Sequence, residues 1–378
     1  MTNALAIPGP QAERRARLRG WAEALLIGAV SRLFAAAILW TSYTFQIPTP
    51  IGRHWTNPFV IWDSDWYLFI VNNGYHAGVV AKTPYGVGYH DFAFFPAYPI
   101  VIDVVSLGRL LDVTIVAPVI SNVLFIVAAV PIFRVLERVG GRSYARFGLL
   151  LFAFSPAAYV YSLAYGEPLF LLFAGLFLLN VGPVRAGILG ALAMFTRLGG
   201  AALAAASLAD LLKRETRFRG VIGIAAVYAA FAAWWLWIAQ LTGNFMGYML
   251  GSPAWYSADT PTGSLTGIAS ILAPTQTSAW VPLAVFMTIV VLVLLAIGTL
   301  SLLRRGELRL GLYAAACVAS TMLVTWNTMP RLAVVAFPAF GALAALLPNN
   351  GTRWALIGLS AAGEAVLGSL AIAGIVVP

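Results

Sequence analysis

The amino-acid sequence predicts an all-α integral membrane protein, a single bundle of about eleven membrane segments. Hydrophobic residues make up 61% of the chain and charged residues only 10%, whereas soluble domains carry about 25% charged residues. The apolar residues form continuous runs, and the basic residues cluster between those runs. A water-soluble fold is therefore excluded. The net charge of +9 indicates positively charged cytoplasmic loops rather than nucleic-acid binding.

The first 20 residues form a basic tail, which we expect on the cytoplasmic side and partly without regular structure. The apolar run 21–46 that follows lacks a small-residue cleavage site, so it is predicted to be a retained anchor that runs outward. Arg32 lies inside this run and is predicted either to snorkel to the interface or to face the bundle. The whole of 21–378 is expected to form one transmembrane domain.

The first extracytoplasmic loop is predicted at residues 47–112. Its second half, 94–111, is apolar enough to suggest a span. A crossing there would place the basic residues of 134–146 outside, against the usual distribution of positive charge. We therefore expect two helices that lie on the outer membrane surface and flank the loop.

The later spans are expected to alternate in direction across the bilayer. They are predicted at residues 113–134, 146–164, 168–182, 220–241, 281–303, 310–326, 331–347 and 354–375. Residues 186–212 are too short for two full spans and are predicted to form a helical pair broken near 196–200. Residues 242–280 form a second long extracytoplasmic loop. The only cysteine, Cys317, excludes an intrachain disulfide and is interpreted as a packing residue.

This topology places four polar stretches on the outer side and the basic loops on the other side. The four stretches are residues 62–91, 162–168, 196–200 and 326–331. Charged residues at membrane-facing span ends are costly unless a partner or a function holds them. The sequence therefore predicts a site built from these stretches.

Asp63 and Asp65 stand among aromatic residues in the first of these stretches. At a spacing of two residues on a helix they point in different directions, so only one is expected to face a reacting group. Asp63 is interpreted as a general base that takes a proton from an attacking hydroxyl. Helix N-capping is the alternative, and Asp65 is the second candidate acid.

Arg197 and Arg331 lie at the outer ends of apolar segments. A guanidinium can hold a phosphate with two parallel hydrogen bonds, so both are candidates for an anion site. Interfacial snorkelling is the alternative for each. Glu167 precedes Pro168, so it either caps the next helix or holds one of the arginines or a sugar hydroxyl.

Aromatic and histidine residues on the outer side are further candidates for positioning a substrate. They are Trp62, Tyr67, Tyr165 and His90, with Trp255 and Tyr256 in the second loop. Aromatic residues at this level also form an interface belt, which is the alternative reading. The three histidines share the first loop with Asp91, but they lack the helical spacing of a metal site. No metal is therefore expected, although dependence on a divalent metal is left open.

The chain contains no P-loop, no Rossmann glycine pattern and no nucleophilic-serine motif. A nucleotide-dependent reaction is therefore unsupported, and no cofactor is expected. A donor substrate is expected to arrive through the membrane.

With these residues in view, the chain resembles the PIG-V family, the GPI mannosyltransferase II-like membrane enzymes. The motifs that carry the resemblance occur in the family's order and are spread over most of the chain. They are Trp62-Asp63, Phe69-Ile70, Gly74-Tyr75, Phe94-Phe95-Pro96, Tyr98-Pro99, Ser155-Pro156, Tyr165-x-Glu167-Pro168-Leu169-Phe170, Thr196-Arg197-x-x-Gly200, Pro330-Arg331 and Phe337-Pro338. Each motif alone is weak, whereas the ordered set is specific. The Ala-, Gly- and Arg-rich composition suggests a bacterial member.

The resemblance implies a GT-C-type fold, a multi-helix bundle whose first outer loop carries an acidic catalytic residue. It implies a transferase that moves mannose from polyprenyl-phosphate-mannose to an extracytoplasmic glycolipid or polysaccharide, in a multi-pass protein of the plasma membrane. In this reading Asp63 is the base of an inverting transfer, and Arg331 and Arg197 bind the donor phosphate.

Two other classes of protein are weighed against the transferase. A lipid-linked sugar transporter or flippase would place polar side chains along a path through the membrane, but few occur in mid-span beyond Arg32, and no inverted repeat is visible. A non-catalytic membrane partner would not need the complete set of Asp63, Glu167, Arg197 and Arg331.

Overall fold

The computed structural model describes residues 10–45, 55–76, 82–83, 86–87, 91–179, 181–250, 281–321 and 329–377. Almost all regular structure in these residues is helical, which confirms the predicted all-α class. The helices are α1 (Pro10–Thr44), α2 (Asp63–Asn73), α3 (Ala97–Val105), α4 (Val113–Ala153), α5 (Glu167–Leu178), α6 (Pro183–Thr196), α7 (Ala201–Leu211), α8 (Arg217–Thr242), α9 (Gly247–Leu250), α11 (Val281–Arg304), α12 (Leu308–Ser320), α13 (Met329–Val334), α14 (Phe337–Leu346) and α15 (Asn350–Ile372).

Short elements complete the regular structure. They are the 3-10 helices η1 (Asp91–Ala93), η2 (Ala158–Ser162) and η3 (Leu198–Gly200), and the strands β1 (Lys82–Thr83) and β2 (Gly86–Val87). The two strands pair antiparallel, with Lys82 opposite Val87 and Thr83 opposite Gly86.

Within the described residues, five helices are long and apolar enough to cross a membrane, so the chain is a multi-helix membrane protein. They are α1 from Arg17 onward, α4, α8, α11 and α15. The shorter apolar helices have 10–17 residues, fewer than the roughly 20 that a full crossing needs. The predicted count of eleven segments is therefore not confirmed as full-length helices in the part of the chain that the structure describes.

The first helix begins at Pro10, well before the span predicted to start at residue 21. Residues 11–19 consist largely of Ala, Arg, Glu, Gln and Leu, which are strong helix formers. Proline suits the first position of a helix because its missing N–H would have no partner there. The second half of the stretch predicted as a tail is therefore helical.

Helix α4 covers the span predicted at 113–134 and the first part of the span predicted at 146–164. Its helical backbone breaks at Gly140 and at Gly141, where φ is 81°, a left-handed value that glycine adopts without strain. This break falls inside the predicted basic loop 134–146. The prediction that the second span runs to residue 164 is wrong, because the helix ends at Ala153 and Pro156 cannot continue it.

The helical backbone is interrupted in two other predicted segments, once against the prediction and once in agreement with it. The segment predicted at 331–347 is divided into α13 and α14, and Pro338 lies in the first turn of the new helix, where a proline is tolerated. The helical pair predicted over 186–212 is confirmed as α6 and α7, with η3 between them.

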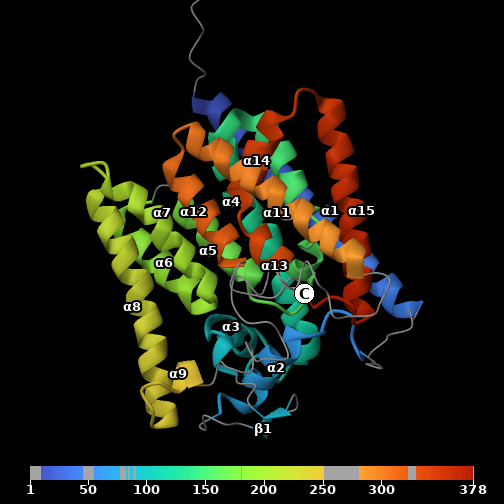
Figure 1. Cartoon of the computed structure of the whole chain (residues 1–378), viewed down its shortest axis with the longest axis vertical. Helices are drawn as coiled ribbons and strands as arrows, with labels where there is room; N and C mark the ends of the chain where they lie inside the picture. Colours follow the sequence, from blue (N-terminus) through green and yellow to red (C-terminus); the bar gives the residue numbers. More distant parts are fainter. Residues whose placement is uncertain are drawn as a thin grey trace, which may run out of the picture.

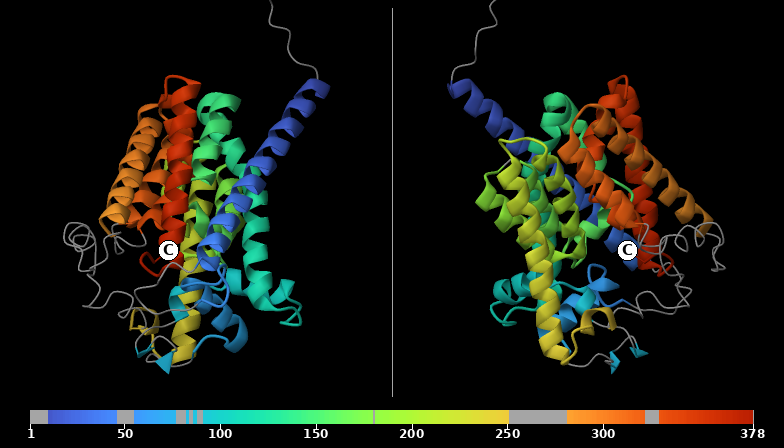
Figure 2. Two further views of the ribbon diagram at one scale, coloured as in Figure 1. Left: turned by 90° about the vertical axis from the view of Figure 1, so that its right-hand side faces the viewer. Right: turned by 60° about the vertical axis from the view of Figure 1, so that its left-hand side comes forward.

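Helices α2 and α3 and the two strands lie together at one end of the helical bundle, as Figures 1 and 2 show. Helix α3 has nine residues, too few to cross a membrane. The first loop therefore carries two short helices, as the sequence predicts. The basic residues of the predicted loop 134–146 lie toward the other end, where Glu23 of α1 pairs with Arg142 and Arg146.

Helix α2 is fixed to this end by its apolar face. Trp66, Tyr67, Ile70 and Val71 are all buried, at a spacing that places them on one side of a helix. The Tyr67 ring meets the Tyr98 ring of α3 edge-on at 4.9 Å. This packing anchors the first residue of α2, which is Asp63.

Candidate active site

Four charged side chains from four separate segments meet at the end of the bundle that carries α2. They are Asp63 at the start of α2, Glu167 at the start of α5, Arg197 between α6 and η3, and Arg331 in α13. Each comes from a different one of the four predicted polar stretches. We call these four residues the charge cluster.

The charge cluster is connected by short ion pairs. The Arg331 Nη1 atom donates a hydrogen bond to Asp63 Oδ2 at 2.7 Å, and Arg331 Nε lies 2.8 Å from Glu167 Oε1. Arg197 Nη1 lies 2.9 Å from the same Glu167 oxygen. Glu167 therefore bridges two guanidiniums, and its side chain is only 3% exposed.

Asp63 is presented by an unusual backbone turn. Trp62 just before it has φ 53°, a left-handed value that is strained for a bulky residue. The Trp62 indole Nε1 donates to the carbonyl of Ala371 in α15 at 3.2 Å. The Asp63 N–H donates to the Tyr165 hydroxyl at 3.3 Å. Trp62 is the N-cap and makes no side-chain cap bond, so the N-capping alternative for Asp63 is not what the structure has.

Arg197 leaves the helical path at the end of α6. Its backbone is extended, with φ −170° and ψ 157°, and the chain then turns into η3. A side chain at Gly200 would bring a Cβ within 2.5 Å of Met194 Cα, so only glycine permits this close return of the backbone. The Phe170 ring of α5 lies 5.8 Å from the Arg197 guanidinium.

Neither arginine of the charge cluster snorkels. The Arg197 and Arg331 side chains are 13% and 15% exposed, and both are paired with carboxylates. Arg331 also lies over the Tyr165 ring, 4.9 Å from its centroid, a favourable cation–π distance. The snorkelling alternative is therefore replaced by buried ion pairing.

Tyr67 and Asp65, both in α2, lie near the charge cluster. Burial, followed by the negative charge of Glu167, raises the pKa of Tyr67 above its ordinary value, so its phenol stays protonated at neutral pH. A Cβ at Gly166 would lie 3.3 Å from the Tyr67 hydroxyl, which shows how closely α2 approaches the start of α5. Asp65 lies half-buried in the first turn of α2, and the ion pairs of the charge cluster involve Asp63 instead.

Of the three histidines in the first loop, His76 lies within the described residues. His54 and the predicted positioning residue His90 lie outside the described residues, as do Trp255 and Tyr256. The His76 Nδ1 atom lies 2.9 Å from Asp91 Oδ2, and the Phe69 ring stacks on His76 at 4.9 Å. Within the described ranges, no group of three or more His, Cys, Asp or Glu residues could hold a metal ion.

Glu364, a fully buried acid in α15, was not among the functional residues predicted from the sequence. Its Oε1 atom lies 3.9 Å from Arg32 Nη2, so Arg32 faces the bundle instead of snorkelling. A lone carboxylate within the apolar run 354–375 was the available signal, because such a group needs a partner in a membrane.

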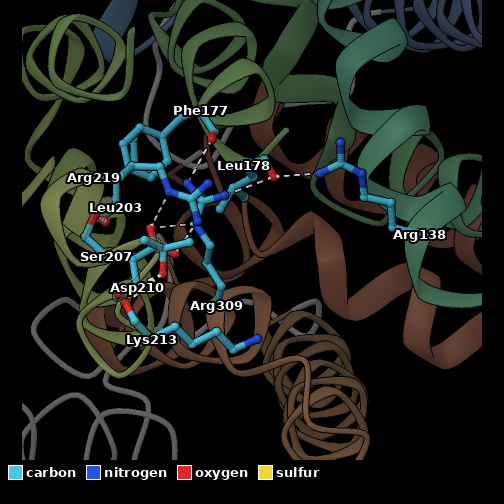
Figure 3. A network of polar contacts seen from close by, with 10 residues as sticks. Arg138, Phe177, Leu178, Leu203, Ser207, Asp210, Lys213, Arg219 and Arg309 are labelled. Atoms are coloured by element: carbon cyan, nitrogen blue, oxygen red, sulfur yellow. Dashed lines mark hydrogen bonds and ion pairs between the residues drawn. The ribbon is translucent and has the colours of Figure 1, made fainter. Parts of the chain in front are cut away.

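A second ionic network lies at the C-terminal end of α5, and Figure 3 shows its side chains. Asp210 of α7 pairs with Arg219 of α8 and, at 3.2 Å, with Arg309 of α12. Arg309 Nη2 donates to the Phe177 carbonyl at 2.9 Å, and Arg138 and Arg309 both donate to the Leu178 carbonyl. These bonds satisfy the carbonyls at the end of α5, which a short helix inside a bundle leaves unpaired.

Replacing Asp210 with Asn is expected to lower the free energy of unfolding by about 3–5 kcal/mol, because two buried guanidiniums lose their shared acid. Thermal unfolding of the purified protein in detergent measures this. The control is Glu137→Gln, because the Glu137 carboxylate is 36% exposed and pairs at 3.4 Å with Arg134. We expect the control to change stability by less than about 1 kcal/mol. Equal melting temperatures for the two variants would contradict the prediction.

These features define a class: a multi-helix membrane protein with a buried set of paired charges at one end of its bundle. The family model described as mannosyltransferase (PIG-V) matches residues 22–235, more than half of the 378 residues. The chain belongs to this family and is a mannosyltransferase. The matched range contains Asp63, Glu167 and Arg197, whereas Arg331 lies beyond it. A comparison with curated proteins finds no match.

Proposed function

We propose that this mannosyltransferase moves mannose from a polyprenyl-phosphate-mannose donor to a hydroxyl group of an extracytoplasmic glycolipid or polysaccharide. The observation that carries the proposal is the charge cluster, in which Asp63 is bonded to Arg331 at the end of an apolar bundle. A donor carried on a lipid can reach such a place through the bilayer. The basic opposite end would face the cytoplasm, with the N-terminus, in the plasma membrane.

The transfer is a single displacement. The Asp63 carboxylate takes the proton of the acceptor hydroxyl while the hydroxyl oxygen attacks C1 of mannose. The new bond from C1 to the acceptor oxygen forms as the bond from C1 to the phosphate oxygen breaks. The electron pair of that bond leaves with polyprenyl phosphate. Attack opposite the leaving group turns a β-linked donor into an α-mannoside, and no covalent enzyme intermediate is needed.

The formal charge of the cluster supports this assignment. Two carboxylates and two guanidiniums sum to zero. When Asp63 takes a proton, the cluster gains one positive charge. At the same moment the phosphate diester of the donor becomes a monoester and gains negative charge. Arg331 and Arg197 would therefore stabilise the leaving group as its charge develops, which is the main electrostatic contribution expected of such a site.

The remaining candidates have positioning roles in this proposal. Glu167 holds the two guanidiniums side by side, and Tyr165 contacts both Asp63 and Arg331. Trp62, Tyr67 and His90 are proposed to position the sugar or the acceptor. Asp65 remains the second candidate acid. No cofactor or metal is assigned to the reaction, so we expect transfer to persist in EDTA.

The test reconstitutes the protein in lipid vesicles with radiolabelled polyprenyl-phosphate-mannose and a membrane-lipid extract as acceptor. We expect label in a new lipid or polymer. Movement of the labelled donor across the bilayer without a new product would favour the lipid-linked sugar transporter or flippase instead. If the donor binds but is neither transferred nor moved across the bilayer, the result would favour a non-catalytic membrane partner.

A further inference from the structure

Arg32 lies within the apolar helix α1, yet its guanidinium is buried against the segment that leads into the charge cluster. The residue is 3% exposed. Its Nη1 atom donates to the Ala158 carbonyl at 2.8 Å and to Ser162 Oγ at 3.0 Å. Its Nη2 atom donates to the Ala153 carbonyl at 3.1 Å. One side chain thus binds three points of a chain segment more than 120 residues away.

The surroundings of Arg32 are built to hold a charge. The Phe125 ring lies 4.3 Å from the guanidinium and the Tyr161 ring 5.6 Å from it. A carboxyl oxygen of Glu364 in α15 lies 3.9 Å from Arg32 Nη2. Ionisable groups at membrane depth are costly and usually have a function.

The segment held by Arg32 is irregular backbone inside the bundle. Helix α4 ends at Ala153, and η2 covers Ala158–Ser162, so the last carbonyl of α4 lacks a helical partner. Irregular backbone at this depth is tolerated only where protein groups satisfy it. Arg32 bonds the last residue of α4 and both end residues of η2, which fixes how the chain turns between them.

The same segment is held from its other side by α4. Ser162 Oγ donates to the Asn122 side-chain oxygen at 2.9 Å, and Ser121 Oγ donates to the Tyr165 carbonyl at 2.9 Å. Tyr165 follows Ser162 by three residues, and Glu167 follows by five. The hydroxyl of Tyr165 receives the Asp63 N–H, and its ring lies under Arg331. A shift of this segment therefore moves contacts of three members of the charge cluster.

We infer that Arg32, paired with Glu364, is a positioning residue for mannosyl transfer. It holds residues 153–165 in one backbone conformation. That conformation places Tyr165 and Glu167 next to the other members of the charge cluster. This inference rests on the proposed function. Arg32 touches no reacting group in this account and acts through Tyr165.

The first test is Arg32→Lys, which keeps the charge but lacks the planar fork that reaches three acceptors. We expect the turnover number per folded enzyme to fall about 10- to 100-fold, because a small misplacement of catalytic groups has effects of this size. We expect the donor KM to change less than about threefold, since substrate binding contacts remain. An unchanged turnover number would overturn the inference.

Arg353→Lys is the matched control. Arg353 is also buried, donates to the carbonyls of Ala344 and Leu347 and to Asn350, and lies over the Tyr144 ring. It lies in the first turn of α15, a helix that begins at the end of the bundle away from α2 (Figure 1). We expect this variant to lose stability but to keep its turnover number per folded enzyme. An equal loss of turnover in both variants would indicate a merely structural role for Arg32.

A double-mutant cycle tests whether Arg32 acts through Tyr165. Tyr165→Phe removes the hydroxyl that receives the Asp63 N–H. We expect Arg32→Lys to reduce turnover by a smaller factor in the Tyr165→Phe enzyme than in the wild type, because coupled residues are not additive. Independent, multiplicative losses would overturn the inference. If Arg32→Lys does not fold, Ser162→Ala removes one of its acceptors and is expected to show the same coupling with a smaller loss.

Hydrogen–deuterium exchange separates this inference from the proposed function. In Arg32→Lys or Ser162→Ala we expect faster exchange in peptides covering 155–167 and 61–66, with other peptides unchanged. Uniformly faster exchange, or no change at 61–66, would overturn the inference. A wild-type protein that makes no mannosylated product would contradict the proposed function instead, and the exchange result would still decide the role of Arg32.

Discussion

The Asp63→Asn enzyme is expected to lose turnover by a factor of about 10² to 10⁴, the usual contribution of a general base. Asparagine has nearly the same shape, and its side-chain oxygen can still accept the hydrogen bond that Arg331 donates at 2.7 Å. It cannot take the proton of the acceptor hydroxyl. The defect should therefore appear in the turnover number, with folding and donor affinity close to those of the wild type.

The control for Asp63 is another carboxylate at the same end of the bundle. Asp103 of α3 is 50% exposed and lies 3.8 Å from Arg109. We expect Asp103→Asn to keep at least about half of the wild-type turnover, because exposed pairs of this kind contribute little. Measured in parallel with radiolabelled donor, full activity in Asp63→Asn would refute the base assignment. In that case Asp65→Asn becomes the variant to test next.

The second large effect is expected for Arg331→Ala. Arg331 contacts both acids of the charge cluster, and in our proposal it binds the phosphate of the donor. Its loss should raise the donor Kd by about tenfold or more, since hydrogen bonds to charged groups contribute about 1.5–3 kcal/mol. Turnover should fall by a further factor of about 10² to 10³, as it does when an oxyanion-stabilising group is removed. Equilibrium binding and single-turnover transfer measure the two effects separately.

Two variants make the Arg331 result specific. Arg331→Lys keeps the positive charge but not the fork that contacts Asp63 and Glu167 together, so we expect an intermediate loss. Arg109→Ala removes an exposed arginine of the same end, whose side chain is 50% exposed, and should leave donor affinity unchanged. A donor Kd for Arg331→Ala equal to that of Arg109→Ala would remove Arg331 from the donor site.

The members of the charge cluster were predictable from the sequence because each is an ionised residue at the end of an apolar segment. Asp63, Glu167, Arg197 and Arg331 are separated by up to 268 residues, yet the alternation of spans placed all four on one side. The sequence does not predict that they form ion pairs with one another, because Glu167 next to Pro168 is equally compatible with a helix cap; the distance between Glu167 and Arg331 decides this.

The breaks within helices were harder to predict. Pro156 and Pro338 are compatible with a helix start or a kink as well as with a stop, so the end of α4 at Ala153 and the division between α13 and α14 depend on packing. Apolar runs also show where a helix lies but not whether it crosses a bilayer. The short helices around α5 are therefore distinguished from full spans only in the structure.

The strained turn at Trp62 and the partner of Arg32 were beyond sequence pattern. A left-handed tryptophan is unfavourable locally and persists through tertiary contacts such as its bond to Ala371. Arg32 and Glu364 are 332 positions apart in the printed sequence, and no periodicity links them. Only the topology of α1 against α15 brings the two charges together.

The central claim is that the charge cluster transfers mannose from a polyprenyl phosphate to an acceptor hydroxyl. The most direct test is to incubate the wild-type enzyme with labelled polyprenyl-phosphate-mannose and acceptor lipid, and to measure released polyprenyl phosphate and mannosylated product in one sample. The account predicts equal amounts of both, with the new linkage in the α configuration by NMR and both formed at least about 100-fold more slowly by Asp63→Asn. Product with retained β configuration, or product formed by the Asp63→Asn enzyme at the wild-type rate, would contradict it.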